Sequence, residues 1–238
     1  MNCPKCLSES VVKNGSLGNG KPKFQCNSCG RQFVENPKKQ IISDDKKELI
    51  DRLLLERISL AGISRVMKVS EQWLQTYVND KYDNIIKKVD VKKKEKGHLT
   101  IQCDELWSFC GKKDNKQWVW LGIDIDTGEI VGLFVGDRSE KGAKGLWDSL
   151  PAVYRQCAVS YTDFWEAYNL VFPNSRHHSV GKETGKTNKI ERFNCTIRQR
   201  VSRLVRSSLS FSKKIENHIG AIWYFIHDYN AKISEVFV

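Results

Sequence analysis

Three acidic residues in the second half of the chain have the types and surroundings of a metal-dependent site that acts on phosphate esters. Asp104 ends a predicted strand at 99–104, Asp163 ends a later predicted strand, and Glu191 lies near the start of a long predicted helix. Neighbouring strands that end at one sheet edge would bring both aspartates together. The carboxylates would repel one another without cations. Two Mg²⁺ (or Mn²⁺) ions roughly 4 Å apart would instead activate the attacking and leaving oxygens at phosphorus.

A simpler interpretation is open for each of these carboxylates, which are also common in strand-end turns and on the exposed faces of helices. The alternative metal-binding carboxylates are Glu105, Asp124 and Asp126. Of these, Asp126 belongs to the sequence Asp126-Thr127-Gly128, which predicts a hairpin turn rather than a catalytic position.

Four cysteines near the N-terminus predict a second, structural metal site. They form two Cys-x-x-Cys pairs separated by nineteen residues: Cys3, Cys6, Cys26 and Cys29. This spacing is typical of a tetrahedral Zn²⁺ site, and four thiolates leave no open position for catalysis. A redox pair is the alternative, but two matching pairs favour zinc. The remaining cysteines are interpreted as small buried apolar residues: Cys103, Cys110, Cys157 and Cys195.

The segment 58–78 predicts two short helices of a helix-turn-helix, at 59–67 and 70–78, with Ser70 as an N-terminal cap. The second of these would present base or phosphate contacts from Glu71, Gln72, Gln75 and Thr76. An ordinary three-helix packing unit is the alternative. Further DNA contacts are predicted around Glu191, at Lys182, Lys186, Lys189, Arg192, Arg198 and Arg200.

Several ring-bearing residues lie near the acidic residues in the sequence. His177 and His178 are interpreted as structural histidines in preference to metal ligands or general bases, and the sequence does not decide their role. Trp107, Trp165 and Phe193 are interpreted mainly as core residues, with stacking on a DNA base as the alternative.

The charge distribution favours a nucleic acid partner. The formal net charge is +11, with +8 in residues 1–98, −3 in residues 99–185 and +6 in residues 186–238. Basic flanks around an acidic middle suit a carboxylate site served by DNA-binding surfaces, although ordinary solvated charge would look similar. No signal peptide and no apolar run of about 18 residues is present, so a cytoplasmic, nucleoid-associated protein is expected.

The order of predicted elements indicates an α+β catalytic core with a mixed sheet. Strands are predicted at 99–104, 117–124, 129–135, 158–162 and 176–180, and helices at 139–150, 165–171, 188–205 and 212–231. Three antiparallel strands followed by alternating helices and strands is the order of the RNase H-like fold. The predicted domains are a zinc ribbon at 1–40, a helix-turn-helix at 41–80, a basic linker at 81–98 and the core at 99–238.

A series of motifs resembles the transposases of the insertion sequence 1 family over nearly the whole chain. The motifs are CDELWSF at 103–109, GDRS at 136–139, YTDFWEAY at 161–168, IERFN at 190–194, IRQR at 197–200 and SLSFSK at 208–213. The resemblance implies an RNase H-like core of the Asp-Asp-Glu type, with the triad on Asp104, Asp163 and Glu191. Twenty-seven residues separate Asp163 from Glu191, somewhat more than the family pattern, and the loop at 173–187 can absorb the excess.

These features together predict a DNA transposase that binds terminal inverted repeats, cleaves a phosphodiester at each end and transfers the 3′-hydroxyl to target DNA. Pairing two ends predicts a homodimer or a higher homo-oligomer. A catalytically inactive DNA-binding regulator and a nuclease without strand transfer are the alternatives. The sequence does not specify the end sequence, the target preference, a copying or cut-and-paste pathway, or the oligomer size.

Overall fold

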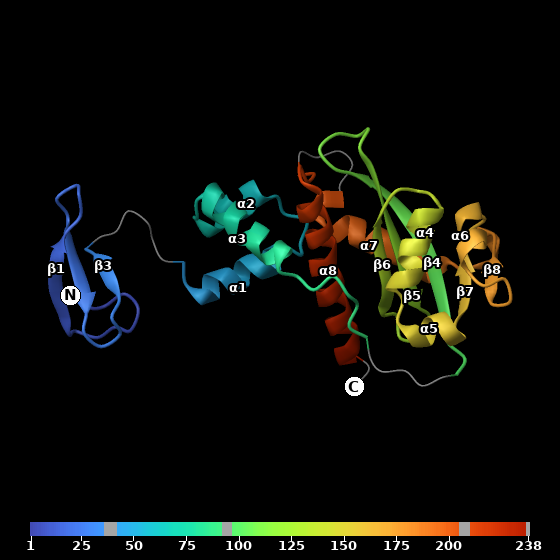
Figure 1. Ribbon diagram of the computed structural model, residues 1–238, viewed down its shortest axis with the longest axis horizontal. Coiled ribbons are helices and arrows are strands. Elements are labelled where there is room, and N and C mark those ends of the chain that lie inside the picture. Colours follow the sequence, from blue (N-terminus) through green and yellow to red (C-terminus); the bar gives the residue numbers. More distant parts are fainter. Residues whose placement is uncertain (36–41, 92–96, 205–209, 237–238) are drawn as a thin grey trace. The chain divides into compact units, whose positions relative to one another are not determined.

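The structure of the protein, a computed structural model, describes residues 1–35, 42–91, 97–204 and 210–236. The chain forms two compact units, Met1–Asp45 and Lys46–Val238, drawn in Figure 1. Parts of several predictions lie outside the described residues: 36–40 of the ribbon, 41 of the helix-turn-helix domain, 92–96 of the linker, 205 of a helix, 208–209 of the last motif, and 205–209 and 237–238 of the core. Within the described ranges, no helix combines the length and apolar character needed to cross a bilayer.

The first unit contains a small antiparallel sheet with the strand order β1-β2-β3. Its strands are β1 (Val11–Ser16), β2 (Pro22–Cys26) and β3 (Gln32–Val34). Among the described residues of this unit, only the cysteines Cys3 and Cys26 are buried apolar side chains. So small a core stabilises a fold poorly, which agrees with the expectation that this unit needs a metal to hold it together.

Three helices begin the second region of the chain: α1 (Asp44–Leu53), α2 (Leu60–Met67) and α3 (Glu71–Asp83). The Ser59 hydroxyl caps α2 by accepting from Gly62 N, and the Ser70 hydroxyl caps α3 by accepting from Trp73 N. Lys68 adopts a left-handed conformation between them, with φ at 50°. The two predicted helices are confirmed. The second runs five residues further than expected, so the segment predicted as a linker from residue 81 begins as helix.

A five-stranded mixed sheet forms the centre of the second unit, with the order β6-β5-β4-β7-β8. The strands are β4 (Thr100–Phe109), β5 (Lys116–Asp124), β6 (Ile130–Gly136), β7 (Val159–Thr162) and β8 (His177–Ser179). Strands β4, β5 and β6 are antiparallel, while β7 runs parallel to both β4 and β8. The predicted mixed α+β architecture is therefore confirmed.

Helices lie on both faces of this sheet (Figure 1). The helices α4 (Glu140–Ser149), α5 (Ala152–Cys157) and α6 (Glu166–Val171) pack with Ile101, Cys103 and Trp120 in one core. The opposite face carries α7 (Asn188–Arg200), which contacts β4 and β5, and α8 (Ile215–Val236), which contacts β6. The site described below lies where α7 approaches β4.

Other sequence predictions differ from the structure within and around the sheet. The strand predicted to end at Asp104 continues to Phe109, because residues 105–109 pair with β5 from Trp120 to Lys116. The helix predicted at 188–205 ends at Arg200, where Val201 is extended and a short 3-10 helix follows at Ser202–Leu204. Helix α5 was not predicted, since six residues are too few to show a helical period.

Candidate active site

Strand register, rather than strand ends, brings the two aspartates together. Strand β4 pairs with β7 in parallel, with Gln102 opposite Tyr161, and Asp104 and Asp163 each lie two residues further on. The carboxylate of Asp104 accepts a hydrogen bond from Glu105 N at 2.9 Å, and that of Asp163 accepts one from Trp165 N at 3.0 Å. Oxygens of Asp104, Asp163 and Glu105 lie within 4.8 Å of one another. The structure thus groups three carboxylates.

Two residues of helix α7 hydrogen-bond to strand β4 beside these carboxylates. Ile190 N donates to the Gln102 side chain at 2.9 Å, and Asn194 Nδ2 donates to Asp104 Oδ2 at 2.7 Å. In the first turn of the helix, Glu191 accepts from the Thr187 hydroxyl at 2.8 Å. Glu191 lines the same cavity of about 230 Å³ as the two aspartates, but it is not part of the tightest carboxylate group.

The electrostatics of this cavity favour a bound cation. Burial, together with the nearby charges of Glu105 and Asp163, raises the pKa of Asp104 to about 7, against the opposing bond from Glu105 N. Carboxylates held this close resist full ionisation unless a positive charge compensates them. Hard divalent cations such as Mg²⁺ prefer oxygen ligands of this kind, so the residues fit a divalent metal.

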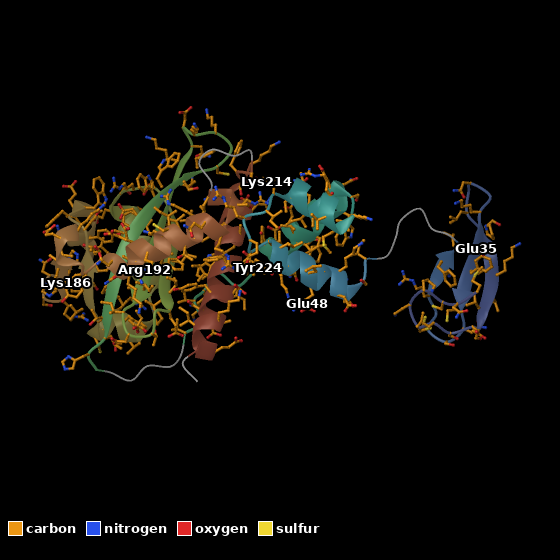
Figure 2. All side chains as sticks on the ribbon, turned by 180° about the vertical axis from the view of Figure 1, so that it is seen from behind. Glu35, Glu48, Lys186, Arg192, Lys214 and Tyr224 are labelled. Atoms are coloured by element: carbon orange, nitrogen blue, oxygen red, sulfur yellow. The ribbon has the colours of Figure 1, made fainter. Side chains whose placement is uncertain are left out.

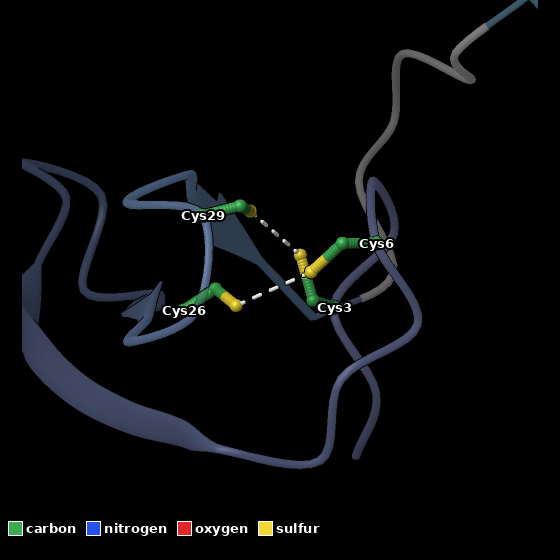
Figure 3. Close-up of side chains that lie close together, drawn as sticks. All are labelled: Cys3, Cys6, Cys26 and Cys29. Atoms are coloured by element: carbon green, nitrogen blue, oxygen red, sulfur yellow. Dashed lines mark hydrogen bonds between the residues drawn. The ribbon is translucent and has the colours of Figure 1, made fainter.

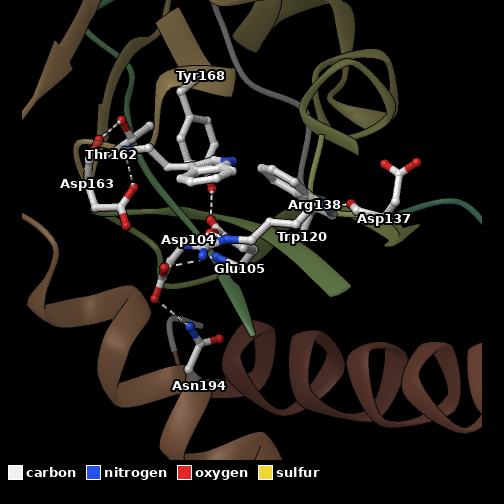
Figure 4. A network of polar contacts seen from close by, with 10 residues as sticks. Asp104, Glu105, Trp120, Asp137, Arg138, Thr162, Asp163, Tyr168 and Asn194 are labelled. Atoms are coloured by element: carbon white, nitrogen blue, oxygen red, sulfur yellow. Dashed lines mark hydrogen bonds and ion pairs between the residues drawn. The ribbon is translucent and has the colours of Figure 1, made fainter. Parts of the chain in front are cut away.

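Glu105, one of the alternative carboxylates, already has protein partners (Figure 4). Its side chain is 1% exposed and pairs with Arg138 at 2.7 Å, while the Tyr168 hydroxyl donates to its other oxygen at 2.8 Å. Burial raises the pKa of Glu105, against the opposing bonds from Tyr168 and Arg138. Its charge is therefore balanced inside the protein.

The other alternative carboxylates lie away from the cavity. Asp124 is fully buried and accepts bonds from the Tyr154 hydroxyl, at 2.6 Å, and from the backbone N of Asp126 and Thr127. Asp126 is an exposed residue of the turn between β5 and β6, and Gly128 there has φ at 75°. The hairpin turn predicted at 126–128 is confirmed.

Two of the six basic residues predicted to contact DNA near Glu191 line the cavity, namely Lys182 and Arg198. Arg192 on α7 and Lys186 are both exposed (Figure 2). The Lys186 ammonium lies 4.9 Å from the centre of the Tyr161 ring. Lys189 instead donates to the backbone oxygen of Ile125.

Arg200, the sixth predicted contact, is engaged within the protein. Its guanidinium donates to Leu55 O at 2.8 Å and pairs with Glu56 at 2.8 Å. The structure therefore does not bring Lys189 or Arg200 to the cavity, because both side chains bind parts of the protein remote in sequence.

The rings near the acidic group are mostly structural. The His177 ring nitrogen Nε2 bonds the Thr162 hydroxyl at 2.8 Å, and burial lowers the pKa of this histidine. His178 is exposed and stacks on Tyr161. Phe193 is buried, with its ring centre 4.6 Å from that of Tyr229. Trp165 is half-buried and contacts the Arg138 guanidinium.

Sequence reasoning did not identify Asn194 and Arg138 as parts of the site. Asn194 is 8% exposed, and its Oδ1 has no partner among the described residues. A helical spacing of three residues from Glu191 was the available signal for Asn194, since such residues share one helix face. Arg138 lay within a recognised motif but had no assigned role. Its partner Glu105 is 33 positions away, a separation that carries no local signal.

The four N-terminal cysteines converge as predicted (Figure 3). Their sulfur atoms all lie within 4.8 Å of one another, with Cys3 and Cys29 at 3.6 Å and Cys6 and Cys26 also at 3.6 Å. Ligands about 2.3 Å from a tetrahedral zinc would be about 3.8 Å apart, which matches this arrangement. The cluster is therefore suited to zinc.

The other four cysteines agree only in part with the prediction that they are buried. Cys103 and Cys110 are buried, Cys157 is half-buried and Cys195 is exposed. The prediction is wrong for Cys195, which lies on the outer side of α7 beside the buried Asn194.

Helix α3 has a buried face and an exposed face. Leu74 and Val78 are buried. The four residues predicted to contact DNA are all exposed: Glu71, Gln72, Gln75 and Thr76. A polar exposed face above an apolar buried one leaves these side chains accessible to a partner.

Comparison with known proteins gives one consistent family. A family model described as IS1 transposase matches residues 98–231, a range that includes Asp104, Asp163 and Glu191. The insertion element iso-IS1n protein InsB of Shigella dysenteriae is 32% identical over 130 residues, covering 54% of this chain and 94% of the relative. The IS1 protein InsB of Shigella flexneri is 31% identical over 129 residues, covering 54% and 95%. The IS1 4 protein InsB of Escherichia coli (strain K12) is 30% identical, covering 54% and 74%.

Proposed function

Because this chain belongs to the IS1 transposase family and is a DNA transposase, we propose that Asp104, Asp163 and Glu191 form the acidic triad that cuts and joins its DNA. One observation carries the proposal: the parallel register of β4 and β7 sets two carboxylates side by side in a cavity that Glu191 also lines. The sheet order, with β4 at its centre, supports an RNase H-like core.

The acidic residues would hold divalent metal and so prepare a scissile phosphate for attack. Two bound Mg²⁺ ions would stabilise the charge that develops on the attacking and leaving oxygens. Asp104 and Asp163 would supply ligands from the sheet, and Glu191 would complete the site from α7. Asn194 restrains the rotation of the Asp104 carboxylate through its 2.7 Å bond. Lys182 and Arg198, which line the cavity, would contact the phosphates of the entering strand.

The N-terminal half of the chain would bind the ends of the insertion sequence. The cysteine cluster would bind one structural Zn²⁺, and α2 and α3 would act as a helix-turn-helix whose exposed α3 face reads the terminal inverted repeats. Pairing two such ends requires at least two protein copies, so we expect self-association on DNA.

The direct test is strand transfer with pre-cleaved inverted-repeat ends in Mg²⁺. Asp104→Asn should abolish joining and leave binding to the ends intact, because the change keeps the size of the side chain and removes only its charge. Asp126→Asn is the matched control, since Asp126 is an exposed turn carboxylate outside the cavity.

Three other outcomes would contradict the proposal in different ways. Cleavage without joining would identify a nuclease. Inverted-repeat binding without any chemistry in the unaltered protein would identify a regulator. Full activity in Asp104→Asn would remove Asp104 from the reaction.

A further inference from the structure

We propose that Arg138 is a positioning residue that holds the carboxylates of Asp104 and Asp163 at metal-binding distance. This inference rests on the proposed function of those two aspartates as metal ligands. Arg138 itself is not expected to touch metal or DNA in this role. It would act through the two residues that orient the aspartates, Glu105 and Trp165.

The Arg138 guanidinium is held on three sides. Its centre lies 4.5 Å from the ring of Trp118 and 4.1 Å from the ring of Trp165. Its edge donates to Glu105 Oε1, from Nε at 2.8 Å and from Nη2 at 2.7 Å. A planar cation between two indoles and beside a carboxylate combines cation–π attraction with charge-assisted hydrogen bonds. Such a group has little freedom to move.

Two of the three residues that Arg138 contacts, Glu105 and Trp165, also orient one of the aspartates. Glu105 N donates to Asp104 Oδ1 at 2.9 Å, and Trp165 N donates to Asp163 Oδ1 at 3.0 Å. Arg138 therefore links strand β4, which carries Asp104, to the segment after β7, which carries Asp163. A shift of the guanidinium would move both carboxylates and change the distance between them.

The surroundings show why an arginine suits this position. The Glu105 side chain is 1% exposed, and a buried carboxylate without a partner is strongly unfavourable. The Tyr168 hydroxyl donates to the second Glu105 oxygen, so both oxygens have protein partners although Glu105 lies within 4.8 Å of the Asp104 and Asp163 oxygens. The backbone before Arg138 is fixed in turn, because Trp120 Nε1 donates to Asp137 O at 2.9 Å.

Lysine at this position would keep the charge but lose the flat surface that stacks between two indoles and the two-point contact with Glu105. Residues that orient metal ligands typically change metal affinity by 10- to 100-fold when altered. We therefore expect Arg138→Lys to weaken metal binding about tenfold. Folding and binding to the inverted repeats should not change.

The test measures Mn²⁺ binding to the full chain without DNA, by electron paramagnetic resonance of the free ion, together with the unfolding temperature. Arg155→Lys on α5 is the matched control and should bind Mn²⁺ as the unaltered protein does. Should Arg138→Lys unfold, the double variant Glu105→Gln with Arg138→Met removes the buried carboxylate and its half-exposed partner charge together, and it should also bind Mn²⁺ weakly.

A folded Arg138→Lys protein with unaltered Mn²⁺ affinity would overturn the inference. Asp104→Asn, measured in parallel, separates this failure from a failure of the proposed function. If Asp104→Asn also binds Mn²⁺ normally, the aspartates are not the metal ligands. If it loses Mn²⁺ while Arg138→Lys does not, only the role of Arg138 is wrong.

Discussion

The cysteine cluster and the acidic cavity bring their side chains together in different ways. Cys3 and Cys29 are 26 positions apart and belong to two short local turns, whereas Asp104 and Asn194 are 90 positions apart on different elements. The cysteines form a closed set of four with no free position, and the carboxylates line an open cavity. A site that holds a fold can be built from local sequence, whereas a site that takes in a substrate depends on the packing of distant elements.

The largest expected effect is the unfolding of the first unit when the cysteine cluster is disrupted. Cys26→Ser, or removal of the metal with a chelator, should unfold the first unit, because metal binding supplies on the order of 10 kcal/mol to small zinc-dependent folds. Circular dichroism and limited proteolysis should show the loss within residues 1–35, while the second unit keeps its unfolding temperature. Zinc content that stays at one ion per chain in Cys26→Ser would contradict this interpretation.

The acidic cavity leads us to expect a smaller effect, in which a substitution raises the stability of the protein. Because the pKa of Asp104 is raised to about 7, the folded metal-free protein binds more protons than the unfolded chain between about pH 4 and 7. Its stability should therefore decrease as the pH rises through this range. Asp104→Asn should remove that dependence and raise the stability at pH 8 by on the order of 2 kcal/mol, or about 5 °C.

Thermal unfolding at several pH values without metal measures this effect. Asp126→Asn, in an exposed turn, serves as the control and should leave the pH dependence unchanged. Equal pH dependence in Asp104→Asn and the unaltered protein would mean that the pKa of Asp104 is not raised in the folded protein. Saturating Mg²⁺ should reverse the order of stability, since only the unaltered protein binds the ion well.

The sequence predicted features that depend on residues close together in the chain better than features that depend on contacts between distant segments. Spacing alone predicted the convergence of the cysteines, and the cap residue Ser70 predicted where α3 begins. The pairing of Asp104 with Asp163 was expected from strand ends, but it comes from register, because β4 continues past Asp104.

Roles that depend on tertiary partners could not be predicted. Arg200 and Lys189 looked like DNA contacts, yet their partners Glu56 and Ile125 lie 144 and 64 positions away in sequence. Charge and helical position are the same whether such a side chain meets a phosphate or another part of the protein. Arg138 was unassigned for the same reason, since its contacts come from three separate elements.

The most direct test of the metal site is the metal preference of Asp163→Cys in strand transfer. A thiolate is a soft ligand that binds Mg²⁺ poorly and accepts Mn²⁺ or softer cations more readily. If Asp163 binds the metal used in joining, this variant should be inactive in Mg²⁺ and should regain part of its activity in Mn²⁺. Activity in Mg²⁺ equal to that of the unaltered protein would contradict the assignment of Asp163 as a metal ligand.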